Sequence, residues 1–334
     1  MLITDFNLKC SVILPVYTRK QFVNQALLSL EKQDVDTNMF EVLIISNVEI
    51  NLEESYDLDI QMVISDQMTL AGKLAEGIML AKYEVVTFLE DDDLYCNNRI
   101  STILKYFRSK SDLTFYHNAS IQFRYSEMQK KVFDSCSNSS IQKVFKIKEG
   151  MDTDISRSDE MYLYKSQSDY NLSSMALRKN FIVDYVEKIA SLGTRYIDTF
   201  FFAIALYKGN SLLIDSKVLT YIRINEFNAS QSVELSGNSR PGFIYSVDME
   251  DLIAAFNSLQ ILGKIFVKRF INSRGFDDLM KSDNISRLES IKKITELLKI
   301  YGVYFFRSDV AKKGVIYSIS PRLMHKMITK FHKA

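Results

Sequence analysis

Long runs of apolar residues, separated by polar segments, predict several buried strands in the N-terminal part of the chain. Residues 11–17 (SVILPVY), 40–46 (FEVLIIS) and 84–89 (EVVTFL) are apolar at most positions, and residues 60–65 form a shorter run of the same kind. A strand buried on both faces of a sheet has such a continuous run, whereas a strand with one exposed face alternates. We therefore expect these four segments to be strands of one buried sheet.

Two segments between these runs have the spacing of amphipathic helices. Apolar residues recur at helical intervals in residues 21–33 and 69–82. Strands that alternate with helices predict an α/β fold, in which helices flank a mostly parallel sheet. Ligands bind such sheets beyond the carboxyl ends of the strands, which here are residues 15–18, 46–48 and 90–93.

The same patterns extend through the rest of the chain. The later elements expected are a strand at 112–125, loops with a lid at 126–170, a short strand at 173–177, a helix from Lys179, a buried helix at 199–206, and strands at 211–214 and 218–224. Gly237, Pro241 and Gly242 lie in a polar break, after which the pattern is helical. The expected domains are therefore residues 1–235 and a helical region at residues 236–334.

The most distinctive polar feature is an acidic run, Glu90-Asp91-Asp92-Asp93, directly after the strand expected at 84–89. Neighbouring carboxylates repel one another and raise each other's pKa unless a cation neutralises them. Mg²⁺ typically takes one or two carboxylates and completes its shell with water and substrate phosphates. The run therefore indicates a divalent-cation site at the sheet edge, with a solvated turn as the alternative.

Taken together, SVILPVY, FEVLIIS and EVVTFLEDDDLY resemble the inverting glycosyltransferases of family 2, in that order and spacing, within residues 9–230. These enzymes have the GT-A fold, an α/β sheet that binds a nucleotide sugar. The resemblance implies that a sugar moves from a UDP- or GDP-sugar to a hydroxyl of a glycan or lipid-linked acceptor, with inversion. It also implies Mn²⁺ or Mg²⁺ as cofactor and a role in polysaccharide, glycolipid or glycoprotein glycan synthesis.

The resemblance also implies roles for individual residues of the donor site. Glu90-x-Asp92 matches the family's Asp-x-Asp motif, so Asp92 is the expected metal ligand and Glu90 a second ligand or a contact to water or ribose. Lys73 is expected either near the diphosphate or as a solvated helix lysine. The other expected nucleotide-sugar contacts are Pro15, Val16, Tyr17, Ser46, Asn47 and Asp91. The acidic base contact common in the family is absent at Ser46-Asn47-Val48, which leaves the nucleotide open.

Three later segments are expected to complete the site. Residues 196–200 resemble the family segment that begins a helix and supplies the general base, which makes Asp198 the expected base or a helix cap. Residues 221–230 resemble the closing segment of the family, where Asn225 stands in place of a common histidine and Arg223 is expected to bind phosphate or form a structural ion pair. Ser173 and Ser174 are weaker candidates on the acceptor side.

The charge distribution points to a membrane surface rather than to nucleic acid. The formal net charge is +1, which gives no basic signal for nucleic acid. Residues 307–334 nevertheless hold seven basic residues against one acid, Asp309. Arg322, Lys326, Lys330 and Lys333 lie opposite an apolar stripe of Leu323, Met324, Met327, Ile328 and Phe331 on a predicted helix. Such a helix suits an anionic membrane surface, and packing on the domain is the alternative.

Cysteine usage and the N-terminal residues favour a cytoplasmic protein. Cys10, Cys96 and Cys136 lack the spacing of a zinc site or a disulfide framework, which fits a reducing compartment. Polar residues near the N-terminus do not match a signal peptide. The expected location is therefore the cytoplasm, on the inner face of the cell membrane if the tail binds lipid. Asn-x-Ser sequences such as Asn171-Leu172-Ser173 are then incidental, and His117 is expected at the surface.

Two other functions compete with glycosyl transfer. Sugar-phosphate nucleotidyltransferases carry a glycine-rich phosphate loop after the first strand, and no glycine precedes Gly72 here, which argues against them. A non-catalytic nucleotide-sugar-binding protein stays possible because Ser46, Ile197 and Asn225 depart from the family pattern.

Overall fold

The structure is a computed structural model that describes most of the N-terminal two thirds of the chain. The described residues are 8–16, 20–52, 55–124, 141–147, 156, 158–159, 162–163, 166–193, 196–208, 210–224, 252, 254–259, 288, 291–292 and 295. The chain divides into two compact units, Met1–Asn225 and Glu226–Ala334. The domain boundary predicted near residue 235, most of the predicted helical region and the whole basic tail lie outside the described residues.

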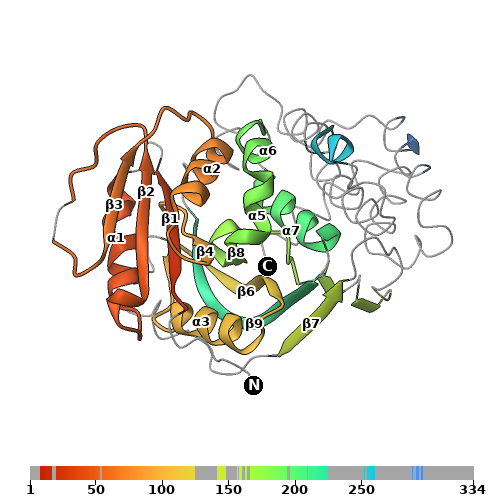
Figure 1. Ribbon diagram of the computed structural model, residues 1–334, viewed down its shortest axis with the longest axis horizontal. Coiled ribbons are helices and arrows are strands. Elements are labelled where there is room, and N and C mark those ends of the chain that lie inside the picture. Colours follow the sequence, from red (N-terminus) through yellow and green to blue (C-terminus); the bar gives the residue numbers. More distant parts are fainter. Residues whose placement is uncertain are drawn as a thin grey trace. The chain divides into compact units, whose positions relative to one another are not determined.

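The strands of the first unit form one large sheet (Figure 1). Its order is β3 (Ile60–Ile64), β2 (Phe40–Ser46), β1 (Cys10–Val16), β4 (Val85–Phe88), β8 (Met175–Arg178), β6 (Leu113–Arg124), β9 (Asn210–Ile224) and β5 (Leu94–Tyr95), and β7 (Gln142–Ile147) also pairs with β9. The first four strands in this order are parallel, as are β6 and β9. The predicted α/β class is thereby confirmed, and antiparallel pairs occur only beyond β4 among the described strands.

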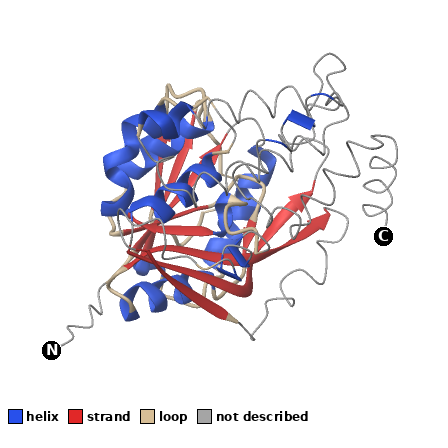
Figure 2. Ribbon diagram, turned by 90° about the vertical axis from the view of Figure 1, so that its right-hand side faces the viewer, coloured by secondary structure: helices blue, strands red, loops and turns tan. Residues whose placement is uncertain are grey.

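Helices pack on both faces of this sheet (Figure 2). The described α-helices of the first unit are α1 (Lys20–Glu31), α2 (Leu70–Leu80), α3 (Arg99–Ser109), α5 (Lys179–Ile182), α6 (Val186–Ala190) and α7 (Ile197–Lys208). Ile13 and Phe88 are register partners and so point to the same face of the sheet. A side chain at Gly77 of α2 would collide with Ile13, and the ring of Phe201 in α7 stacks on Phe88 with centroids 5.1 Å apart. Helices α2 and α7 therefore cover one face.

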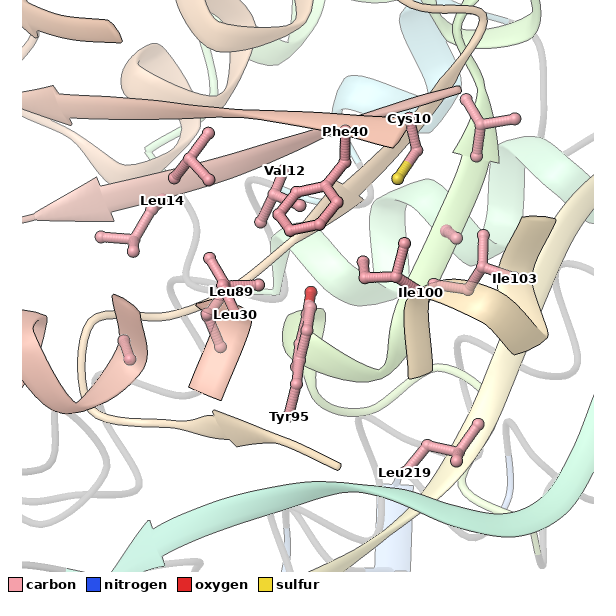
Figure 3. Packing of buried hydrophobic residues seen from close by; sticks show 14 of the residues in the cluster. Cys10, Val12, Leu14, Leu30, Phe40, Leu89, Tyr95, Ile100, Ile103 and Leu219 are labelled. Carbon is pink, nitrogen blue, oxygen red and sulfur yellow. The ribbon is translucent and has the colours of Figure 1, made fainter. Parts of the chain in front are cut away.

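Helices α1 and α3 cover the opposite face, over a continuous apolar core. Cys10, Val12 and Leu14 of β1 belong to this core together with Leu30 of α1 and Ile100 of α3. Figure 3 shows Tyr95 standing among these side chains with its hydroxyl group pointing into the cluster. Within the described residues no helix is both long and apolar enough to cross a bilayer.

The observed elements differ from the predicted ones in four places. Helix α3 and the two-residue strand β5 were not predicted, and β7 lies inside the predicted loop region 126–170. Strand β9 is continuous, although two strands were expected. Its pairing with β6 shifts register near Asn118 and Ala119, opposite the polar Asp215–Lys217 segment that interrupts the apolar pattern. A bulged strand thus imitates two strands with a turn between them.

Two expectations about individual side chains were wrong. Cys96 is disulfide-bonded, whereas no disulfide was expected, and Cys10 is free and buried, which raises the pKa of its thiol to about 12. His117 is buried rather than exposed, and burial lowers its pKa to about 4. Its Nε2 lies 2.9 Å from the carbonyl oxygen of Tyr170.

Candidate functional site

The carboxyl ends of three parallel strands meet at one edge of the sheet. Val16 of β1 is the register partner of Ser46 of β2, and the residues after β4 continue alongside β1, since the Leu89 amide donates to the Ile13 carbonyl at 3.0 Å. The same edge of the sheet therefore carries Pro15, Val16, Ser46, Asn47 and residues 90–93, as the order of strands and helices in the sequence predicted. Tyr17 and Asn225, also expected here, lie outside the described residues.

Lys73 reaches this edge from the face covered by α2. It is fully buried, and its Nζ donates to the carbonyl oxygen of Val16 at 2.7 Å. Burial lowers the pKa of Lys73, while the negative charge of Asp91 acts in the opposite direction. The alternative of a solvated helix lysine is thus wrong: Lys73 joins α2 to the end of β1, within the electrostatic reach of the acidic run.

Asn47 fixes the loop that follows β3. Its Nδ2 donates to the carbonyl oxygens of Ser65 and Gln67 at 2.8 and 2.9 Å. Ser46 is buried, and its Oγ accepts from the Val48 amide at 3.3 Å. Both residues lie at the expected strand end, where these hydrogen bonds shape the loop.

The four acids Glu90, Asp91, Asp92 and Asp93, here called the acidic loop, form a turn in which the three aspartates are buried. The Asp93 amide donates to the Glu90 carbonyl at 3.0 Å and closes the turn. The Glu90 amide donates to Ser173 Oγ at 3.0 Å. A solvated acidic turn would expose its carboxylates, so this alternative is contradicted by the burial.

Arg223 supports the acidic loop from the end of β9. Its Nε donates to the Asp92 carbonyl at 2.8 Å, and its backbone amide donates to Asp93 Oδ1 at 3.2 Å. The guanidinium group is fully buried, lies 4.4 Å from the ring centroid of Phe22 and donates to Gln25 at 2.6 Å. These contacts make Arg223 a structural support of the acidic loop.

The donor set of the acidic loop is of the kind that a hard divalent cation takes. Burial, and after it the charge of Asp92, raises the pKa of Asp93 above its usual range. Within the described residues no three or more acidic, histidine or cysteine side chains are grouped to hold a metal ion. Mg²⁺ and similar ions need only one or two carboxylates when phosphates and water supply the remaining ligands, so Glu90 and Asp92 fit such an ion.

Asp198 lies in the first turn of α7, which begins at Ile197. Its Oδ1 accepts from the Thr199 amide at 2.8 Å, and its Oδ2 accepts from the Asn171 amide at 3.0 Å. Burial and the charge of Asp169 raise the pKa of Asp198 to about 7, although both amide hydrogen bonds oppose this. The carboxylate therefore contacts a helix N–H, as a cap would, and also has the pKa of a general base.

Asn171 links Asp198 to the acidic loop, a role that no sequence signal identified. Its backbone amide donates to Asp198, and its Nδ2 donates to Asp93 Oδ2 at 3.1 Å. Its Oδ1 accepts from Ser174 Oγ at 2.9 Å, which fixes the orientation of the amide. In the sequence Asn171 shows only as the start of an Asn-x-Ser match, although asparagine is among the few residues that tolerate its left-handed backbone (φ 68°).

Comparison with known proteins identifies a family model that matches part of the chain. The model of glycosyl transferase family 2 matches residues 11–157, which include the acidic loop. No curated protein sequence matches the chain.

Solved structures share the fold at low sequence identity. TarS 1–349 from S. aureus in complex with UDP-GlcNAc is 14% identical with a TM-score of 0.50, over 93% of this chain and 79% of that chain. A second structure of TarS 1–349 from S. aureus is also 14% identical with a TM-score of 0.50, over 95% of this chain and 92% of that chain. The chain thus has a GT-A type α/β fold, and its residues 11–157 match the model of glycosyl transferase family 2.

Proposed function

We propose that the protein transfers a sugar, with inversion, from a nucleoside-diphosphate sugar to an acceptor hydroxyl in a reaction that depends on a divalent cation. The observation that carries this proposal is that Asn171 hydrogen-bonds both to Asp198 and to Asp93 of the acidic loop, two sites with different chemistry. The acidic loop is suited to a cation and a diphosphate, and Asp198, with its pKa near 7, is suited to accept a proton. Asn171 holds the two together.

Residues around the strand ends would bind the donor. Glu90 and Asp92 would hold Mn²⁺ or Mg²⁺, which when bound supplies positive charge to the leaving diphosphate. Pro15, Val16, Ser46 and Asn47 end neighbouring strands at the same edge, where a nucleotide lies in sheets of this type. TarS binds UDP-GlcNAc, which places uridine nucleotides first among the donors to test, with guanosine nucleotides second.

Asp198 would act on the acceptor. As the acceptor oxygen forms a bond to the anomeric carbon, its proton passes to the Asp198 carboxylate. The bond between the anomeric carbon and the diphosphate oxygen breaks, and the nucleoside diphosphate leaves with the bonding electrons. Attack from the side opposite the leaving group inverts the anomeric configuration.

The acceptor and the cellular setting follow from charge and from the resemblance to family 2. We propose a glycan or lipid-linked acceptor and a basic tail that contacts an anionic membrane surface. The tail residues lie outside the described part of the chain, so this proposal rests on their sequence pattern.

Donor binding provides the first test. Ligands that bind only the native state raise its thermal stability by mass action. With Mn²⁺ present, at least one UDP- or GDP-sugar should raise the melting temperature of the wild-type protein but not that of Asp92→Ala. Asp34→Ala, which removes an exposed acid, is the matched control and should respond like wild type. Equal calorimetric affinity for nucleotide and Mn²⁺ in wild type and Asp92→Ala would exclude Asp92 as the ligand.

A non-catalytic donor-binding protein is the remaining alternative. It would show the same thermal shifts without any turnover. Release of nucleoside diphosphate from a bound donor, even by slow hydrolysis, separates the two functions.

A further inference from the structure

Asn171 lies between the two halves of the site and touches each with a different part of the residue. Its backbone N–H donates to Asp198 Oδ2 at 3.0 Å, and its side-chain amide donates to Asp93 Oδ2 at 3.1 Å. The side chain is buried, and Ser174 Oγ donates to the amide oxygen. Asp198 follows Asn171 in the chain by 27 residues and Asp93 precedes it by 78, so this contact joins distant segments.

The backbone around Asn171 is built as a fixed turn. Gln167 and Asn171 both have positive φ values, 51° and 68°. The Tyr170 amide donates to the Gln167 carbonyl at 2.9 Å, and the buried His117 contacts the Tyr170 carbonyl. The Ser174 amide donates to the Asn171 carbonyl at 3.0 Å. The positive φ of Asn171 and these hydrogen bonds together set the direction of the N–H that donates to Asp198.

We propose that Asn171 is a positioning residue that sets the placement of Asp198 relative to the acidic loop. This inference rests on the proposed function, because it assumes that Asp198 accepts the proton. Fixing a reacting group in the productive geometry accounts for a large part of enzymatic rate, and a displacement of about 1 Å costs about 100-fold. The backbone of Asn171 acts on Asp198, and its side chain acts on Asp93.

Two substitutions separate these contributions. Asn171→Gly removes the side-chain amide but favours the left-handed backbone, whereas Asn171→Ala removes the same amide and disfavours that backbone. Both variants lose the contact with Asp93 equally. A difference between them therefore reports the placement of the N–H that faces Asp198.

Asn210 provides a matched control. It also has a left-handed backbone, with φ 75°, but it is exposed at the start of β9 and has no part in the site. Asn210→Gly and Asn210→Ala should differ in thermal stability, as expected for any left-handed position, and should have the same kcat. This pair of variants measures how much backbone strain alone changes the thermal stability and kcat.

The experiment measures kcat and nucleotide affinity for all four variants and wild type, with Mn²⁺ and a donor that the wild-type protein uses, well below the melting temperatures. We expect kcat of Asn171→Ala to be about 10- to 100-fold below that of Asn171→Gly, with equal affinity for the nucleoside diphosphate. Equal kcat in these two variants, despite wild-type turnover, would overturn the inference alone. Absence of turnover in the wild-type protein would overturn the proposed function, and the inference with it.

Discussion

At the residue scale, Asp198 is the proposed general base, and its replacement gives the sharpest expected outcome. Asp198→Asn keeps the shape of the side chain and can still accept a hydrogen bond from the Thr199 amide, but it cannot accept a proton at neutral pH. Single-turnover transfer should fall by about 10²- to 10⁴-fold, the usual contribution of general-base catalysis. Nucleotide affinity should stay the same, because the expected donor contacts lie at the strand ends.

A control for this substitution is Asp184→Asn, which changes an acid whose carboxylate pairs with Lys208 at 3.6 Å on the surface. It should leave transfer unchanged. Normal transfer in Asp198→Asn would mean that Asp198 is only a helix cap. The search for the base would then move to Asp169, whose charge acts on Asp198, and to Glu226.

The pH dependence of transfer follows from the same residue. Burial and Asp169 raise the pKa of Asp198 to about 7, and a general base works only as the carboxylate. The rate should therefore fall as the pH drops below about 7, by about tenfold per pH unit, and level off above it. A profile of kcat against pH checks this, and a rate that stays constant between about pH 5 and about pH 8 contradicts the assignment.

The sequence could predict the acids of the site better than the residues that hold them. Four carboxylates directly after a buried strand are a signal in the sequence itself, because their mutual repulsion favours a position where a cation can neutralise them. Lys73 and Arg223 were identified, but a sequence does not say whether a cation is solvated or buried among carbonyl groups. Asn171 has no chemical signal at all, since its role depends on a backbone angle and on partners far away in the chain.

At the element scale, the packing of α2 on β1 places Lys73, and it leaves no room at Gly77. A Cβ atom at Gly77 would lie 2.5 Å from Cγ2 of Ile13, a β-branched side chain with little freedom to move. Gly77→Val should therefore lower the free energy of unfolding by about 1–3 kcal/mol, the usual cost of overpacking. Denaturant unfolding measures this effect.

Met79 on the same helix supplies the comparison. Its side chain is exposed, so Met79→Val should change the free energy of unfolding by less than about 1 kcal/mol, the range of helix propensities. Equal losses in Gly77→Val and Met79→Val would show that α2 does not approach β1 as closely as described.

The elements that the sequence predicted well are those whose burial is complete. Strands β1, β2 and β4 are buried at every position, and this condition produces the continuous apolar runs. Strand β7 (QKVFKI) carries two lysines and lies in a polar region, and β5 has only two residues. Both owe their conformation to pairing with β9, so local sequence gives little indication of either.

At the scale of the whole molecule, we expect the basic tail, residues 307–334, to bind an anionic membrane surface. Exchanging Lys326, Lys330 and Lys333 for glutamate reverses three charges opposite the apolar stripe. Binding to vesicles that contain anionic lipid should fall sharply, because each basic residue near such a surface contributes about 1 kcal/mol. Vesicle flotation measures the bound fraction, and arginine at the same three positions should preserve it. Equal binding of the glutamate and wild-type proteins would mean that the tail does not contact lipid.

The α/β architecture of the first unit was predictable because alternation of apolar strands and amphipathic helices extends over a long part of the chain. The part of the sheet beyond β4, which mixes parallel and antiparallel pairs, was harder to predict, because its strand order depends on which distant strands pair. Strands β8, β6 and β9 lie side by side although β7 and the described helices α5, α6 and α7 intervene in the chain. Such long-range pairing leaves no periodic pattern in one sequence.

The most direct test of the account is the release of nucleoside diphosphate from a panel of UDP- and GDP-sugars in the presence of Mn²⁺, measured for the wild-type protein and Asp92→Ala. We predict that the wild-type protein turns over at least one donor, that a chelator abolishes this turnover, and that Asp92→Ala lacks it while remaining folded. A wild-type protein that binds none of these donors and releases no nucleoside diphosphate from any of them, with or without the metal, would contradict the account.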